Sequence, residues 1–216
     1  VSGRGDKTSY YVSGRYMGQE GIFRHNPDQY DVYNIRARGS VRPYDWLEIE
    51  NEITYSQMEY FFPILNHPSD TPVWRRISDE AVPIAMLRNP DGTLTQNASI
   101  VFGSFISGNN YRDEERRKTK NTSRFSANFF EDQLRINGDF TYERTTNNLI
   151  YLYTPVPYSN QPGNFSQRGE SRMSEDIDEN IYKALNIYGE YTWSSGKHTL
   201  TGLLGYNYEN SILSSR

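Results

Sequence analysis

Strict two-residue alternation is the feature of this sequence that most limits its fold. Along residues 47–55 every second side chain is apolar or amide, and those between are mostly acidic. Because successive side chains of a β-strand point to opposite faces, this pattern predicts a strand with one apolar and one charged face. The same alternation recurs over residues 134–143 and 199–207, whereas helical periodicity is weak throughout. The sequence therefore predicts an all-β protein.

Turn signals at residues 43–45, 131–132 and 195–196 predict three antiparallel hairpins. In each, the chosen register sets apolar residues against apolar ones, and the first also sets arginines against glutamates, as cross-strand pairs prefer. A slip of one residue would exchange the faces. The predicted pairs are Val41 with Leu47, Ile35 with Ile53, Tyr33 with Tyr55, Arg38 with Glu50 and Arg36 with Glu52; Ala127 with Ile136, Phe125 with Gly138 and Arg124 with Asp139; Tyr191 with Leu200, Ile187 with Leu204 and Leu185 with Tyr206.

The connections between the strands are unequal in length. With a further strand at residues 8–17 we expect about seven strands, joined alternately by short turns and by long connections over residues 24–29, 60–121 and 146–180. All short turns then lie at one end of the sheet and all long loops at the other. A transmembrane β-barrel has this arrangement, with short periplasmic turns and long extracellular loops.

A barrel gives each face of the strands a direction. The lipid side is apolar and the lumen is polar, and tyrosines near strand ends, with Trp46 and Trp193 beside short turns, fit aromatic girdles. Nine charged residues are therefore expected to face the lumen: Arg36, Arg38, Glu48, Glu50, Glu52, Arg124, Arg135, Asp139 and Glu190.

An odd number of strands would leave two unpaired edges in lipid, where each unsatisfied backbone group costs several kcal/mol. We therefore expect an antiparallel up-and-down transmembrane β-barrel segment, roughly a third of a ~22-stranded barrel of the plugged size class. Residues 1–216 would form a partial barrel domain, with the plug and the closing C-terminal strand outside them.

Composition excludes several other classes. Cysteine is absent and the net charge is −4, so disulfide frameworks, thiol chemistry and general electrostatic binding of nucleic acid are not expected. The three histidines, at positions 25, 67 and 198, share no ligand spacing. We expect no catalytic residues, no metal site and no cofactor.

The long loops are the richer source of candidate binding residues. Aromatic rings at a lumen mouth suit sugar faces or peptide side chains. The alternative is that they form the loops' own small core or the interface with a lid. The candidate substrate-binding residues are Trp74, Tyr111, Tyr151, Tyr153 and Tyr158. Two charge runs, at residues 112–118 and 175–179, are interpreted as solvated loop faces or as contacts with a partner lipoprotein or lipopolysaccharide. The stretch at residues 89–92 is interpreted as a turn.

Several segments of the sequence resemble a known family. They are residues 7–23, the arginine-rich strand at 33–38, the strand that begins at Trp46 and Leu47, and the segments at 89–93 and 205–209. Over most of its length the sequence resembles the SusC/RagA-like TonB-dependent outer-membrane transporters of Bacteroidetes. The resemblance implies active import of oligosaccharides or peptides across the outer membrane. It also implies a SusD-like surface lipoprotein as a lid and energy from the inner-membrane TonB complex, through parts outside these residues.

Two other classes stay open at this point. A soluble β-sandwich, such as a carbohydrate-binding module, would pack its apolar faces against a second sheet and scatter its loops over both ends. A passive porin-like channel would lack an upstream plug. An enzyme is the least expected class, because no convergent set of acid, base and nucleophile is visible.

Overall fold

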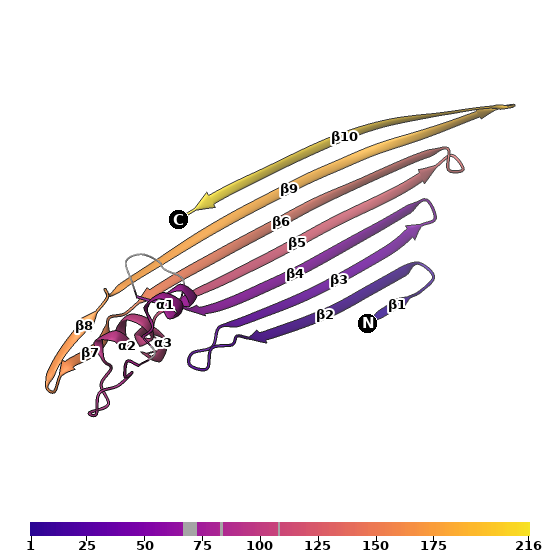
Figure 1. Cartoon of the computed structure of the whole chain (residues 1–216). Coiled ribbons are helices and arrows are strands. Elements are labelled where there is room, and N and C mark those ends of the chain that lie inside the picture. Colours follow the sequence, from indigo (N-terminus) through magenta and orange to yellow (C-terminus); the bar gives the residue numbers. More distant parts are fainter. Residues whose placement is uncertain (67–72, 83, 108) are drawn as a thin grey trace.

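The computed structural model describes residues 1–66, 73–82, 84–107 and 109–216 (Figure 1). Within these ranges it contains one eight-stranded sheet, a separate two-stranded hairpin and three short helices. The sheet strands are β1 (Ser2–Arg4), β2 (Thr8–Glu20), β3 (Gln29–Tyr44), β4 (Leu47–Pro63), β5 (Tyr111–Phe129), β6 (Leu134–Tyr153), β9 (Arg172–Ser195) and β10 (His198–Ser215). The hairpin is β7 (Val156–Gln161) with β8 (Asn164–Arg168), and the helices are α1 (Val73–Glu80), α2 (Gln96–Val101) and α3 (Gly103–Ser107).

The large sheet is an antiparallel meander in which each strand pairs with its neighbours in the chain. Its order is β1-β2-β3-β4-β5-β6-β9-β10, with only the β7-β8 hairpin excluded. The expected up-and-down all-β architecture is confirmed, and the three-residue β1 brings the strand number to eight. Figure 1 shows the short turns together at one end and the helices with the β7-β8 hairpin at the other. The end with the helices, drawn at lower left, is called the upper end or mouth below, and the short-turn end is called the lower end. None of the described helices is long and apolar enough to cross a membrane.

The apolar face of this sheet is open. Ile35, Ile53 and Leu204 are 54%, 47% and 82% exposed, although each lies within a strand of the sheet. Among the described residues no second sheet of comparable size covers either face. The packing that a β-sandwich requires is therefore not what this chain forms.

The three predicted hairpins differ in how well their registers were predicted. The pairing of β5 with β6 is confirmed residue by residue, including Ala127 with Ile136 and Arg124 with Asp139. The registers of β3 with β4 and of β9 with β10 were each wrong by two residues, since Val41 faces Ile49 and Tyr191 faces Gly202. A shift of two leaves every side chain on its predicted face.

Turn chemistry explains both shifts. Proline has no backbone N–H and cannot donate a hydrogen bond to a neighbouring strand. Pro43 was expected in the turn, but it lies within β3 at a register irregularity between Val41 and Tyr44. The turn is formed by residues 45–46 instead. In the other hairpin Gly196 adopts a φ of +62° and opens the turn, so the two turn residues are 196–197 instead of 195–196.

The predicted limits of the long loops were wrong because the strands extend beyond the stretches with clear alternation. The charge run at 112–118 lies in β5 and the run at 175–179 lies in β9, where both were expected in loops. In these upper parts of the strands both faces are largely polar, so hydropathy no longer alternates even though the backbone remains extended.

The described residues between β4 and β5, with α1, α2 and α3, and those between β6 and β9, with β7 and β8, form a small folded insert at the upper end of the sheet. Leu65 and Phe105 pack with Phe23 and Ile77, and a second cluster joins Leu94, Ala98 and Val156 to Ile106 and Tyr158. The first cluster joins α1 to α3 and the second holds α2 and α3 against β7, so the insert has its own apolar core.

Polar side chains complete the insert. Asn110 is fully buried and accepts a hydrogen bond from the Thr154 amide at 2.7 Å. The turn predicted at 89–92 is confirmed, since the Gly92 amide donates to the Asn89 carbonyl at 2.9 Å. Within it the hydroxyl and amide of Thr93 donate to the Asp91 carboxylate, and these bonds hold the pKa of Asp91 below its ordinary value.

Candidate functional site

The sheet register brings the expected lumen-facing residues onto one face. Directly paired residues of neighbouring strands share a face, and Glu50 pairs with Arg124, which pairs with Asp139. Residues two apart on one strand also share a face, so the same side carries all nine residues of the expected set, namely Arg36, Arg38, Glu48, Glu50, Glu52, Arg124, Arg135, Asp139 and Glu190. This side is called the polar face below.

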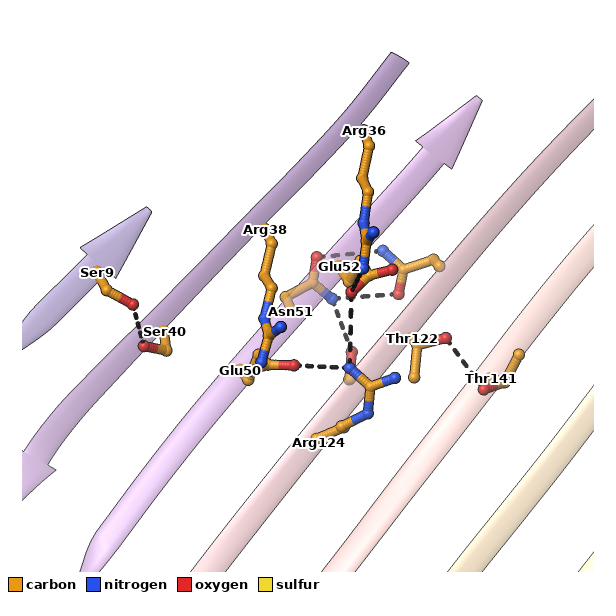
Figure 2. A network of polar contacts seen from close by, with 12 residues as sticks. Ser9, Arg36, Arg38, Ser40, Glu50, Asn51, Glu52, Thr122, Arg124 and Thr141 are labelled. Carbon is orange, nitrogen blue, oxygen red and sulfur yellow. Dashed lines mark hydrogen bonds and ion pairs between the residues drawn. The ribbon is translucent and has the colours of Figure 1, made fainter. Parts of the chain in front are cut away.

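An ion-pair network crosses three strands at the lower part of the polar face (Figure 2). Glu50 accepts hydrogen bonds from Arg38 of β3 and from Arg124 of β5, the latter at 2.6 Å. Arg36 reaches Glu52 at 3.0 Å and Arg42 reaches Glu48 at 2.9 Å.

Two of the ion pairs predicted from sequence thus exist, although their geometry is diagonal. Arg38 lies directly opposite Glu52 and Arg36 opposite Thr54, yet each arginine bonds the glutamate two positions further down β4. Long side chains can reach such diagonal neighbours. The side chain of Glu50 is 12% exposed and that of Arg38 is 49% exposed, so the carboxylates are covered while the guanidinium groups project from the wall.

Hydroxyl and amide contacts extend the polar face sideways on both flanks of the network. The hydroxyl groups of Ser9 and Ser40 lie 2.7 Å apart, and those of Thr122 and Thr141 lie 3.1 Å apart (Figure 2). Further along, Asn186 of β9 donates to the Asp139 carboxylate at 3.0 Å. The polar face is therefore continuous from β2 to β9.

The apolar face carries one polar cluster at middle height. The Asn51 amide donates to the Asn121 side-chain oxygen at 3.2 Å and to the Ser123 hydroxyl at 2.9 Å, and the Asn121 amide donates back to Asn51 at 3.3 Å. Because these amide and hydroxyl groups hydrogen-bond one another across β4 and β5, they do not depend on other hydrogen-bond partners on this face.

Aromatic rings form a ladder at the upper end of the polar face. Tyr30 and Tyr60 are 6.0 Å apart between ring centroids, Tyr60 and Phe62 are 5.9 Å apart, and Phe62 lies 6.2 Å from Phe23. Phe23 in turn lies 5.0 Å from Phe105 of α3. Since Phe105 belongs to the insert, this aromatic ladder connects the wall of the sheet to the folded loop.

Two of the five candidate substrate residues are brought together. Tyr151 and Tyr153 lie on the polar face of β6, with ring centroids 6.3 Å apart and planes inclined by 5°. The guanidinium carbon of Arg112 is 5.9 Å from the centre of the Tyr151 ring, and that of Arg172 is 4.6 Å from the Tyr153 ring. The arginines were not predicted as part of this site, because the strands were expected to end before them.

The other three candidates lie elsewhere. Tyr111 is on the opposite face of the sheet, where its ring is 5.4 Å from that of Phe61. Tyr158 packs against the second core cluster of the insert, as expected for a residue of the loop's own core. Trp74 belongs to α1, but its side chain lies outside the described residues, and so does His67.

The chemistry available on the polar face is that of binding. Within the described ranges, no group of three or more histidine, cysteine or acidic residues is placed to hold a metal ion. What the face offers is guanidinium and ammonium groups, carboxylates, amides, hydroxyls and a few exposed aromatic rings. Such groups bind polar and charged molecules by hydrogen bonds, ion pairs and stacking.

Comparisons with known proteins give a match at the level of structure. No protein-family model matches the sequence, and no curated protein matches it. The fold is similar to three solved structures: the RagAB peptide transporter (TM-score 0.65) and the RagAB peptide importer in a "closed-closed" state (0.63) and in an "open-open" state (0.65). Each similarity has 18% sequence identity and covers 99% of this chain and 24% of the matched chain.

The similarity agrees with the family resemblance of the sequence at the level of fold. The described sheet has the fold of a segment of these transporter chains, and the chain spans about a quarter of their length. The class so defined is an antiparallel up-and-down β-sheet of the kind that forms the wall of a large barrel.

Proposed function

We propose that this chain is part of the wall of a TonB-dependent importer in the outer membrane of a bacterium, and that the importer carries nutrient peptides or oligosaccharides. The observation that carries the proposal is the two-sided open sheet, whose apolar face no second sheet among the described residues covers and whose opposite face is ion-paired. Short turns at one end and long loops at the other add to it. The structural similarity to the RagAB structures supports the same conclusion.

The height of the apolar face fits a bilayer. On β4 the apolar stretch runs over residues 47–55, and on β6 over residues 134–142. A strand that crosses a membrane needs about 9–11 residues when tilted. Above this stretch the same outward side becomes polar, beginning with Gln57, Glu59 and Arg117. This change is expected where strands leave the hydrocarbon region.

The open edges of the sheet support a larger barrel. Within the described residues β10 pairs only with β9, and β2 is covered on its other side only by the short β1. In lipid, such edges would leave rows of unpaired backbone groups. We therefore propose that residues 1–216 are a partial barrel domain, completed by further strands and filled by a plug.

Transport requires binding and release rather than bond chemistry. In this proposal Tyr151 contacts substrate at the mouth, together with the aromatic ladder, and Tyr153, which is only 5% exposed, supports the Tyr151 ring. Trp74 and Tyr158 contribute through the insert, which a SusD-like surface lipoprotein would cover. Tyr111, on the outward face, is better placed to meet lipopolysaccharide. The TonB complex would act through parts outside these residues.

Uptake measurements test the proposal. Cells that produce the complete protein should take up labelled oligosaccharides or peptides in a saturable manner, and uptake should disappear when the inner-membrane TonB complex is deleted. Uptake that survives this deletion would indicate a passive channel instead. A variant that fails to assemble, such as Ile49→Arg, provides the background level.

A further inference from the structure

A row of basic side chains follows the polar face of β5 from the mouth to the ion-pair network. It is called the basic track and consists of Arg112, Arg116, Lys118, Lys120 and Arg124, with Glu114 and Thr122 at the two intervening positions of the same face. Alternate residues of a strand repeat about every 6.6–6.8 Å. The three central cations, Arg116, Lys118 and Lys120, therefore follow one another at this spacing along one wall.

The two ends of the basic track are neutralised by nearby carboxylates. At the mouth Arg112 lies 2.6 Å from Glu114. At the lower end Arg124 lies 2.6 Å from Glu50, which also binds Arg38. Each end of the track therefore has a carboxylate within ion-pair distance.

The positive charges at the centre of the track have fewer carboxylates near them. Arg116 is 3.8 Å from Glu114, a carboxylate already bound to Arg112, and its side chain is 54% exposed. Lys118 is 2.7 Å from Glu143 and 47% exposed, whereas Lys120 makes no ion pair with any described residue. Three cations thus share one nearby carboxylate and part of a second.

Of the two strands that flank β5, β4 supplies no negative charge at this height, whereas on β6 Glu143 lies opposite Lys120. On β4 the residues opposite Arg116, Lys118 and Lys120 are Met58, Ser56 and Thr54. One strand further, Thr54 lies opposite Arg36 of β3. The wall from β3 to β5 is therefore electropositive at middle height, bordered by hydroxyl groups that can accept or donate hydrogen bonds.

We propose that the basic track binds an acidic peptide in extended conformation, with carboxylates at alternate positions. This inference rests on the proposed import function and names its substrate class. The carboxylates of an extended peptide repeat every second residue at the same spacing as the cations of the track. Arg116, Lys118 and Lys120 would each bind one carboxylate, while Ser56 and Thr54 would bond the peptide backbone.

Binding to the purified complete protein tests the inference. The probes are a fluorescent peptide with glutamate at alternate positions and the same peptide with glutamine. The acidic probe should bind about tenfold more tightly at low salt. Added salt should remove this difference, since exposed charges are screened. Lys118→Gln combined with Lys120→Gln should also remove it, because the double variant takes away two of the three central charges of the track.

Arg117→Gln is the matched control, because Arg117 lies between Arg116 and Lys118 on the outward face of the same strand and pairs with Glu115 at 2.6 Å. Its effect on the acidic probe should be negligible. Equal loss in Arg117→Gln and in the double variant would overturn the assignment of the site to the polar face.

The remaining outcomes separate this inference from the proposed function. If both probes are bound and imported equally, and the double variant behaves as wild type, the track has no substrate role while the importer remains. If an oligogalacturonate competes fully with the acidic probe, the selectivity for a peptide is overturned. If neither probe nor any oligosaccharide is imported by an assembled protein, the inference fails together with the proposed function.

Discussion

Ile49 and Glu50 are neighbours in the sequence and lie on opposite faces of β4. Ile49 is 42% exposed on the apolar face, and Glu50 is held between Arg38 and Arg124. We expect Ile49→Arg to prevent outer-membrane assembly, because an arginine in the hydrocarbon region costs up to about 2–4 kcal/mol. Ile136→Arg on β6 should do the same. The measurement is the amount of complete protein recovered in the outer-membrane fraction.

Glu50→Gln is the control for this experiment. The arginines that it leaves behind are half exposed and can bond water, and the glutamine keeps a side-chain oxygen that accepts a hydrogen bond. Assembly should therefore stay at the wild-type level. Equal recovery of Ile49→Arg and Glu50→Gln would contradict the assignment of the two faces.

The candidate substrate residues can be separated in the same manner. Tyr151→Ala should weaken substrate binding, because its ring and Arg112 lie on the polar face at the mouth. Tyr111→Ala should not, because the ring faces outward beside Phe61. Titration of the complete protein with a labelled substrate measures both. If Tyr111→Ala proves to be the more damaging change, the proposed path of the substrate is wrong.

At the level of single elements, the sequence predicted faces better than registers. The register predicted from the turn at Glu131 and Asp132 was correct, because the pairing of β5 with β6 on either side of that turn has no irregularity. The register of β3 failed at Pro43, where a missing backbone donor permits a local shift that alternation cannot detect. Alternating hydropathy specifies which face each side chain occupies, but it does not distinguish registers that differ by two residues. The geometry of the turn decides between those registers.

The candidate site was predicted in part, for a related reason. The lower network, with Arg36, Glu52 and Arg124, lies where apolar and charged residues alternate, and it was found. The basic track continues the same period of two through Arg116 and Lys118, but with polar neighbours on both sides. Residues 112–118 are charged at every position, so neither hydropathy nor charge alternates there, and only the extension of β5 shows which of these residues share a face.

The folded insert gives a prediction for a single element. Asn110 is fully buried and bonds both the amide and the carbonyl of Thr154, at 2.7 and 3.2 Å. Asn110→Ala leaves these backbone groups without a partner, which costs about 1–3 kcal/mol. We expect faster protease cleavage within residues 64–110 and unchanged assembly of the sheet. Asn109→Ala is the neighbouring control, and equal cleavage of both variants would contradict the role of Asn110.

At the scale of the whole molecule, stability depends on what surrounds the sheet. The cores that the described residues form are the two small clusters of the insert, and the large apolar face remains exposed. Water would therefore contact side chains such as Ile35, Ile53 and Leu204, and each edge strand would present unpaired backbone groups. A bilayer on one side and further strands at both edges remove these costs together.

This dependence predicts the behaviour of residues 1–216 produced alone. Without lipid or barrel partners, the apolar face and the open edges of β2 and β10 should associate with other copies. We expect aggregates in aqueous buffer and dispersed, strand-rich material only in detergent, as judged by light scattering and circular dichroism. Ile49→Glu combined with Leu204→Glu, which places charges on the apolar face, should raise solubility in buffer. A stable, monodisperse monomer of the unaltered chain in buffer would mean that another surface covers this face, and the barrel assignment would fail with it.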